Sequence, residues 1–168
     1  MMIVGSRAKN QSAKTELLDL ASWTWTETAD YPPGSNGDIF HDGGLVYIYP
    51  HFYMFGGRPY GNSPGSHDEI HRYDEFEHAW EANFGRLNMR RENFSFILKG
   101  YTLMIYGGRS IETSVDDGIN ENMAPERCVF EGDSINCTTV AQPVLNNAHR
   151  PFLFFVEDDF CRGLAPSY

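Results

Sequence analysis

Five arginines are the side chains of this sequence best suited to bind a partner. Arg58 and Arg109 each follow a pair of glycines, and Arg90, Arg91 and Arg150 stand elsewhere. A guanidinium presents its N–H donors as a planar fork that matches the two oxygens of a carboxylate. We therefore expect these arginines to contact a protein partner. The alternative is that they satisfy loop carbonyls or pair with Asp and Glu of the chain itself.

A group of histidines suggests metal binding. His67, Glu69 and His71 alternate, so on a strand their side chains share one face, and His78 lies across the next turn. Two histidines and a carboxylate can bind zinc. However, His71 falls inside an expected strand, where packing dictates the residue type, and the spacing matches no specific metal motif. The sequence therefore assigns neither a metal nor another cofactor.

Sequence signatures of catalysis are absent. The chain has no Gly-x-Ser-x-Gly elbow, no phosphate loop and no His-Glu-x-x-His, so we assign no catalytic residue. The formal net charge of −10 and the lack of a lysine-rich stripe argue against nucleic acid as a partner. Acidic residues cluster instead, either as a solvated loop or as a surface for a basic partner, at Glu112, Asp116, Asp117, Glu121 and Glu126.

Two of the three cysteines are expected to form a disulfide. Cys128 and Cys137 flank a predicted tight turn at 131–134. Matching Phe130 with Ile135 around that turn places the cysteines opposite each other on neighbouring strands. This pair and three Asn-x-Ser/Thr sequons favour an extracellular or secretory location over a cytoplasmic one. The third cysteine has no expected partner, so the location stays open.

A short phrase recurs at a fixed interval and organises these residues. Its first glycines are Gly5, Gly56 and Gly107, so both steps are 51 residues. A second mark, here called the repeated pair, has six residues between its members and keeps nearly the same period: Leu18 and Trp25, Tyr73 and Trp80, Phe130 and Cys137. A period of this length indicates a repeat architecture.

The residues before the glycines predict β-hairpins. Segments 43–58 and 94–109 overlay without a gap, and each has two runs of β-branched and aromatic residues around a short turn. Each repeat therefore predicts four antiparallel strands.

Residues 13–25 allow a second interpretation. Their leucines could form the apolar side of an amphipathic helix. We predict strands instead, because Leu18 and Trp25 keep the spacing of Tyr73 and Trp80.

With these features the chain resembles the kelch-repeat β-propeller family over about residues 1–160. The resemblance rests on the apolar runs into the glycine pairs, the spacing of Tyr73 and Trp80, and the arginine after each pair. It implies an all-β fold of four-stranded antiparallel blades, in which the glycines allow close approach of backbone. It also implies that Trp25 and Trp80 pack between neighbouring blades. Four residues depart from the family pattern: Ser6, Leu18, Phe130 and Cys137.

The resemblance also predicts an incomplete ring in a single chain. Residues 1–168 would form one kelch-repeat domain or propeller fragment, with parts of blades at 1–26 and 150–163 and blades at 39–81 and 89–138. Propellers close with about 4–8 blades. Either the chain is a piece of a longer protein, or two copies complete each other. We expect the terminal run from Phe152 to Val156 to be a buried strand, so that deleting 150–168 causes aggregation.

The expected function is a non-catalytic protein–protein interaction module or scaffold. In such blades the long connections emerge at one end, where the arginines lie, and long loops on a rigid scaffold usually carry recognition. One alternative is a propeller enzyme acting on a carbohydrate or another small polar substrate. Another is a structural subunit whose ring is completed by other chains. No stretch approaches the roughly 20 apolar residues of a membrane span.

Overall fold

The computed structural model describes residues 2–4, 15–31, 39–60, 65–111, 119–120 and 123–141. Within these ranges the fold is all-β and contains no helix, and hence none long and apolar enough to cross a membrane. The strands are β1 (Met2–Val4), β2 (Thr15–Asp19), β3 (Thr24–Glu27), β4 (Ile39–His41), β5 (Gly44–Ile48), β6 (His51–Phe55), β7 (Arg58–Tyr60), β8 (Glu69–Asp74), β9 (Ala79–Arg86), β10 (Ser95–Lys99), β11 (Thr102–Tyr106), β12 (Ser110–Ile111), β13 (Ile119–Asn120), β14 (Glu126–Glu131) and β15 (Ser134–Thr139).

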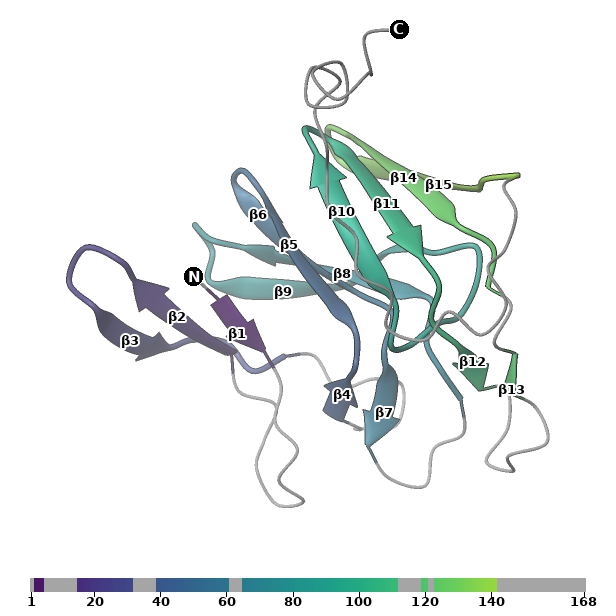
Figure 1. Cartoon of the computed structure of the whole chain (residues 1–168). Helices are drawn as coiled ribbons and strands as arrows, with labels where there is room; N and C mark the ends of the chain where they lie inside the picture. Colours follow the sequence, from purple (N-terminus) through teal and green to yellow (C-terminus); the bar gives the residue numbers. More distant parts are fainter. Residues whose placement is uncertain are drawn as a thin grey trace, which may run out of the picture.

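Most of the strands form three antiparallel sheets (Figure 1). The first sheet has the order β1-β2-β3, the middle sheet β5-β6-β8-β9 and the third sheet β10-β11-β14-β15. Two short pairs, β4 with β7 and β12 with β13, extend the structure at the end where the long connections lie. The predicted four-stranded antiparallel sheets are therefore confirmed. The described residues form no closed ring.

The strand registers follow the repeated pair. Leu18 lies opposite Trp25, and Tyr73 lies opposite Trp80. Strands, and not a helix, therefore occupy residues 15–19 and 24–27, as predicted. Each partner pair is set by a short turn, so local sequence suffices to define it.

The middle and third sheets stack face to face. The first strand of one sheet contacts the first strand of the other, β5 with β10, and the last strand contacts the last, β9 with β15. The strands of the two sheets therefore follow each other in the same order. We call β5 and β10 inner strands, and β9 and β15 outer strands. Their shared core contains Tyr53, Phe55, Ile70, Leu103 and Ile105, all buried. Burial of a side chain of this size contributes about 1.5–3 kcal/mol to stability. Because this cluster has more buried members than any other in the described residues, it is their main apolar core.

A smaller cluster joins the first sheet to the middle sheet. Met2, Phe52 and Tyr73 are its buried members, and Trp80 packs against them. Trp80 Nε1 also donates a hydrogen bond of 2.9 Å to Thr15 Oγ1. Trp80 thus links two sheets, as expected.

Trp25 departs from the expectation that it packs between blades. Its side chain is 47% exposed. The physical reason is its direction, because Trp25 lies on the face of the first sheet that is turned away from the middle sheet.

The glycine phrases occupy places where backbones meet. Gly57 and Gly108 have φ values of +91° and +85°. A Cβ atom on Gly108 would lie 2.6 Å from the Glu92 carbonyl oxygen, and one on Gly57 would lie 2.8 Å from that of His41. Only glycine fits such positions without strain.

Several predicted features lie outside the described residues. They are Arg150, Cys161, the expected strand at 152–156, and four members of the acidic cluster, Glu112, Asp116, Asp117 and Glu121.

Candidate functional site

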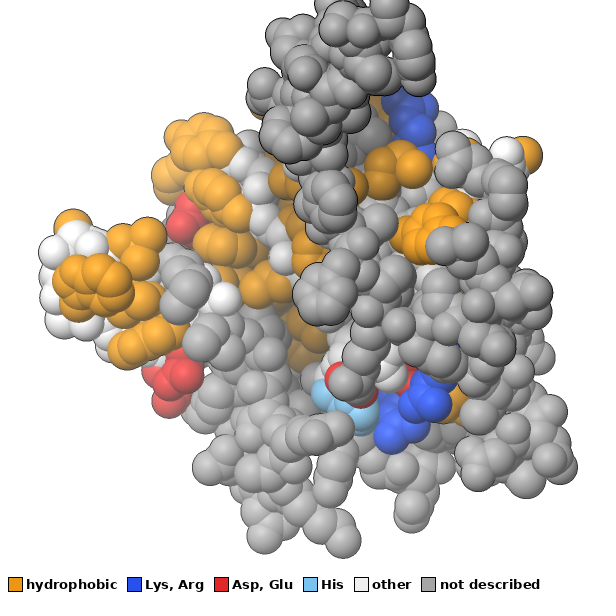
Figure 2. All heavy atoms as spheres, viewed as in Figure 1, with side chains coloured by type: hydrophobic (Ala, Val, Ile, Leu, Met, Phe, Trp, Pro, Cys, Tyr) orange, Lys and Arg blue, Asp and Glu red, His pale blue; other side chains and the backbone are white. Residues whose placement is uncertain are grey.

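Two arginines meet one buried carboxylate at the long-connection end of the sheets. Arg109 Nε donates a hydrogen bond of 2.7 Å to Glu92 Oε1, and Arg58 Nε lies 3.6 Å from Glu92 Oε2. The Glu92 side chain is fully buried, whereas those of Arg58 and Arg109 are 40% and 28% exposed. We call these three residues, with His41 and Asp42, the arginine cluster. Figure 2 shows basic, acidic and histidine side chains together at the place where β4 and β7 lie in Figure 1.

The repeat explains how the chain builds this cluster. His41 lies opposite Arg58 in the β4–β7 pair, and Glu92 lies opposite Arg109 in an isolated antiparallel bridge 51 residues further along. The residues that follow, Asp42 and Asn93, both have positive φ, of 60° and 54°. Asp and Asn tolerate this left-handed conformation better than most residues. Equivalent turns therefore place a polar side chain beside each arginine.

Hydrogen bonding fixes Arg58 and leaves part of it unused. Arg58 Nε donates to His41 Nε2 at 3.2 Å, so the other ring nitrogen of His41 carries the proton and donates to Asp42 Oδ2 at 2.8 Å. The terminal nitrogens of Arg58 and Arg109 make no hydrogen bond to any described residue. Both guanidinium groups are thus oriented through Nε and still offer donors to a ligand.

The remaining predicted arginines differ in environment. Arg90 is exposed, and its side chain has no hydrogen bond or ion pair with the described residues. Arg91, in contrast, is fully buried and lies 2.5 Å from Glu126 Oε1, with further hydrogen bonds to the carbonyl oxygens of Gly107 and Ala124. The prediction that Arg91 contacts a partner is therefore wrong, because its side chain is fully buried and a partner cannot reach it.

Glu126 is likewise misplaced in the predicted acidic cluster. Its buried carboxylate accepts hydrogen bonds from Arg91 and from the backbone N–H groups of Asn88 and Met89, at 2.7 and 3.1 Å. It belongs to the sheet interior and not to a solvated loop, because these three donors compensate the loss of water.

The histidines of the suspected metal site form a packed polar group. Glu69 Oε2 lies 3.1 Å from His67 Nδ1 and 3.8 Å from His71 Nε2. His71 Nδ1 accepts a hydrogen bond of 3.3 Å from the Asn83 backbone, so the proton resides on Nε2, which faces Glu69. Burial lowers the pKa of His71 to about 4, so this imidazole is neutral at pH 7. With its Nε2 protonated and its Nδ1 engaged, His71 acts as a packing residue here, in edge contact with Tyr31.

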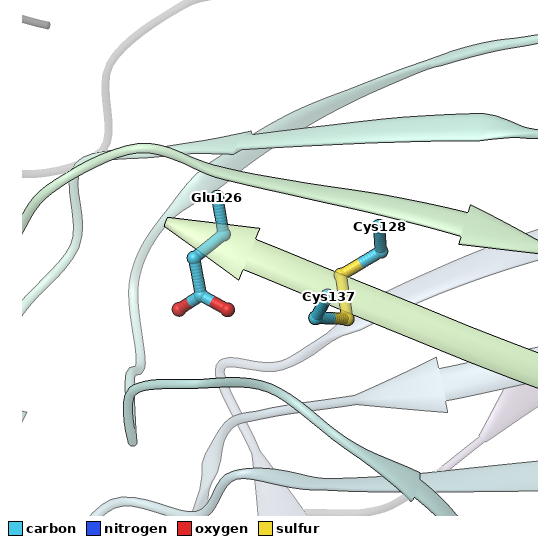
Figure 3. Close-up of side chains that lie close together, drawn as sticks. All are labelled: Glu126, Cys128 and Cys137. Carbon is cyan, nitrogen blue, oxygen red and sulfur yellow. A yellow bond between two sulfur atoms is a disulfide. The ribbon is translucent and has the colours of Figure 1, made fainter. Parts of the chain in front are cut away.

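In another group of potential metal ligands, the two cysteines are bonded to each other. Glu126, Cys128 and Cys137 bring their ligand atoms within 4.8 Å of one another (Figure 3). The two sulfur atoms form a disulfide, and the Cα atoms are 4.0 Å apart. The register pairs Phe130 with Ile135 and Cys128 with Cys137, which confirms the predicted alignment.

An open recess lies at the opposite end of the sheets, between the short turns. Its volume is about 450 Å³, and Tyr49, His51, Tyr101 and Asp133 are among its lining residues. Asp133 is paired with Arg72 at 2.7 Å. The described residues of the lining include no Ser, Thr, Cys or Lys, and the tyrosine phenols are their only hydroxyl groups. The arginine cluster is the better candidate for recognition.

Sequence reasoning missed Glu92. The signal that could have found it is its repeat position, because Glu92 stands 51 residues after His41 and therefore opposite the arginine of its own repeat.

Comparison with known proteins assigns no family to this chain. No family model matches the chain, and no curated protein matches it. Among solved structures, that of YjhT is similar at 16% identity with a TM-score of 0.48, over 60% of this chain and 28% of the YjhT chain. This chain thus aligns with less than a third of YjhT, and the likeness carries no argument about fold or activity.

Proposed function

We propose that the three sheets are kelch-type propeller blades and that the chain is a non-catalytic protein-interaction module. The repeated strand order and the contacts of inner strand with inner strand and outer strand with outer strand support the blade assignment. The glycine phrases support it as well, because they recur where neighbouring backbones approach.

The observation that carries the interaction role is the pair of guanidinium groups held by Glu92. Their Nε atoms are engaged, whereas their terminal nitrogens have no acceptor among the described residues. A carboxylate that reaches both arginines could accept charge-assisted hydrogen bonds from each. Because the guanidiniums are already oriented, binding loses less side-chain entropy than it would with free arginines. The expected ligand is an Asp, Glu or C-terminal carboxylate of a protein partner.

Because the chain is acidic overall, its arginines attract a carboxylate only at short range. The chain carries −10 formally, so its overall field repels an acidic partner. Screening at physiological salt reduces that field beyond about 8 Å. Affinity for a carboxylate must therefore come from contact with Arg58 and Arg109 and not from steering.

A peptide array tests the proposal. Acidic peptides are compared with the same peptides in which Asn and Gln replace Asp and Glu. The variant carries Arg58→Ala, Arg109→Ala and Glu92→Gln, because Glu92 would otherwise be left as an unpaired buried charge. Glu92→Gln alone is the matched control, and Arg86→Ala tests an exposed arginine of an outer strand.

The expected result is selective binding of acidic peptides by the native chain and by Arg86→Ala. Glu92→Gln alone measures the part of the affinity that depends on holding the two arginines in place. The triple variant should lose at least about tenfold in affinity, since a hydrogen bond to a charged group contributes about 1.5–3 kcal/mol. Equal binding of acidic and amide peptides, or full binding by the triple variant, would refute the role of the arginines.

A further inference from the structure

Each described contact between sheets uses the same two kinds of face. The face of the first sheet that carries Met2 and Leu17 packs against the face of the middle sheet that carries Phe52 and Trp80. We call the former a trailing face and the latter a leading face. Trp80 reaches across this contact to Thr15 on the trailing face.

The second contact repeats the arrangement. The trailing face of the middle sheet, with Val46 and Tyr53, packs against the leading face of the third sheet, with Leu103 and Phe130. The rings of Tyr53 and Phe130 lie edge to face with centroids 4.8 Å apart. A leading face in this fold is thus covered by a trailing face in both instances that the structure describes.

The leading face of the first sheet is exposed around Trp25, although Leu18, which lies opposite Trp25 on the same face, is buried. Trp25 shares it with Glu16 and Glu27, because side chains alternate along β2 and β3. At the adjoining turn Trp23 is 73% and Leu20 59% exposed. Figure 2 shows hydrophobic side chains gathered over β2 and β3, at the left edge of the view. Large apolar side chains grouped in this way mark an interaction surface.

The third sheet offers a complementary trailing face. Ile97, Met104 and Arg127 stand in one row across β10, β11 and β14, opposite in direction to the buried Cys128 and Phe130. Ile97 and Met104 are half-buried, and Arg127 is exposed. The Arg127 side chain has no hydrogen bond or ion pair with the described residues.

We propose that a second copy of this chain covers the leading face of the first sheet with the trailing face of its third sheet. Trp25 holds the repeat position of Trp80. Arg127 occupies the repeat position of Thr15, because each stands three residues before the first member of its repeated pair, Phe130 and Leu18 respectively. Since Trp80 contacts Thr15, Trp25 of one copy meets Arg127 of the other.

The chemistry of the two faces fits this pairing. A guanidinium over an indole ring gains a cation–π interaction of about 0.5–2 kcal/mol. Glu16 and Glu27 flank Trp25 with charge opposite to that of Arg127. The contact is head-to-tail, so a two-fold dimer contains it twice. Two chains bring six sheets together, which lies within the roughly 4–8 of closed propellers.

Molar mass by light scattering over a range of concentrations tests the proposal. The native chain should reach twice its 19.1 kDa mass. Trp25→Ala and Arg127→Glu should each weaken association at least about tenfold. Phe76→Ala is the matched control, because Phe76 is 71% exposed in the β8–β9 turn of the middle sheet and lies on neither face. Circular dichroism verifies that these exposed substitutions leave the fold intact.

Charge reversal provides a second readout. Arg127→Glu combined with Glu16→Lys and Glu27→Lys should restore the dimer, because the opposite charges face each other again. A native chain that stays at 19.1 kDa at all concentrations would overturn the proposal. So would a dimer that both single variants leave unchanged. Arg58 and Arg109 lie on neither face. The outcome of this test therefore does not depend on the outcome of the peptide array.

Discussion

At the scale of residues, the environment of an arginine decides its role. Arg91 and Glu126 form a fully buried ion pair that ties the β9–β10 connection to β14. Burial lowers the pKa of Arg91, and the Glu126 carboxylate opposes that shift. Removing one partner of such a pair typically costs about 3–5 kcal/mol, because the other charge stays buried. Arg58 and Arg109 are partly exposed beside one buried carboxylate, that of Glu92, and keep donors for a ligand.

His71 makes stability depend on pH. Its pKa falls from about 6.5 in the unfolded chain to about 4 in the fold, chiefly through burial. Between these values the unfolded chain binds a proton that the folded chain does not. The contribution of His71 is therefore present above pH 6.5 and is lost as the pH falls towards 4. The full loss is on the order of 3 kcal/mol.

Urea unfolding at several pH values from 7.5 to 4.5 measures this effect. His71→Gln should flatten the dependence between pH 6.5 and 4, whereas the exposed His78→Gln should retain it. Parallel curves for the native chain and His71→Gln would show that another group is responsible.

At the scale of elements, the β14–β15 hairpin is closed by a disulfide. Cys128 is buried and lies opposite Cys137, nine residues apart in the chain. We expect peptides containing these residues to be linked in non-reducing mass spectrometry. Cys128→Ala with Cys137→Ala should lower the free energy of unfolding by about 2–3 kcal/mol, since a short loop restricts the unfolded chain only moderately.

Reduction supplies the control for this prediction. Dithiothreitol should bring the native protein to the stability of the double variant and should not affect that variant. Free thiols at both positions in the untreated protein would contradict the bond.

At the scale of the whole molecule, cohesion is uneven. The middle and third sheets share the large core, whereas the first sheet is held by the small cluster around Met2, Phe52 and Tyr73. Regions with few buried apolar contacts open at low free energy. Amide hydrogens of 15–27 should therefore exchange before those of 102–106.

Hydrogen exchange with mass spectrometry measures this order at low protein concentration, where association is minimal. Trp80→Phe should accelerate exchange in 15–27 further, because it removes the hydrogen bond to Thr15. Uniform exchange across the three sheets would show that they unfold as one unit.

The sequence by itself determined the hairpins of the repeats and the pairing of their strands. The pairing of Leu18 with Trp25 and of Cys128 with Cys137 follows from alternation and a short turn, both of which are local. The 51-residue period likewise predicted that equivalent strands recur. These properties depend on neighbours within one hairpin, which the order of residues specifies directly.

Only the tertiary structure decided what the polar residues do. Arg91 and Arg109 are both arginines of connecting segments, yet one is buried against Glu126 and the other is partly exposed beside Glu92. Glu126 lies 35 residues from Arg91, and its pairing depends on how β14 packs against the preceding connection. Burial and charge compensation arise from such distant contacts, so spacing along the chain does not reveal them.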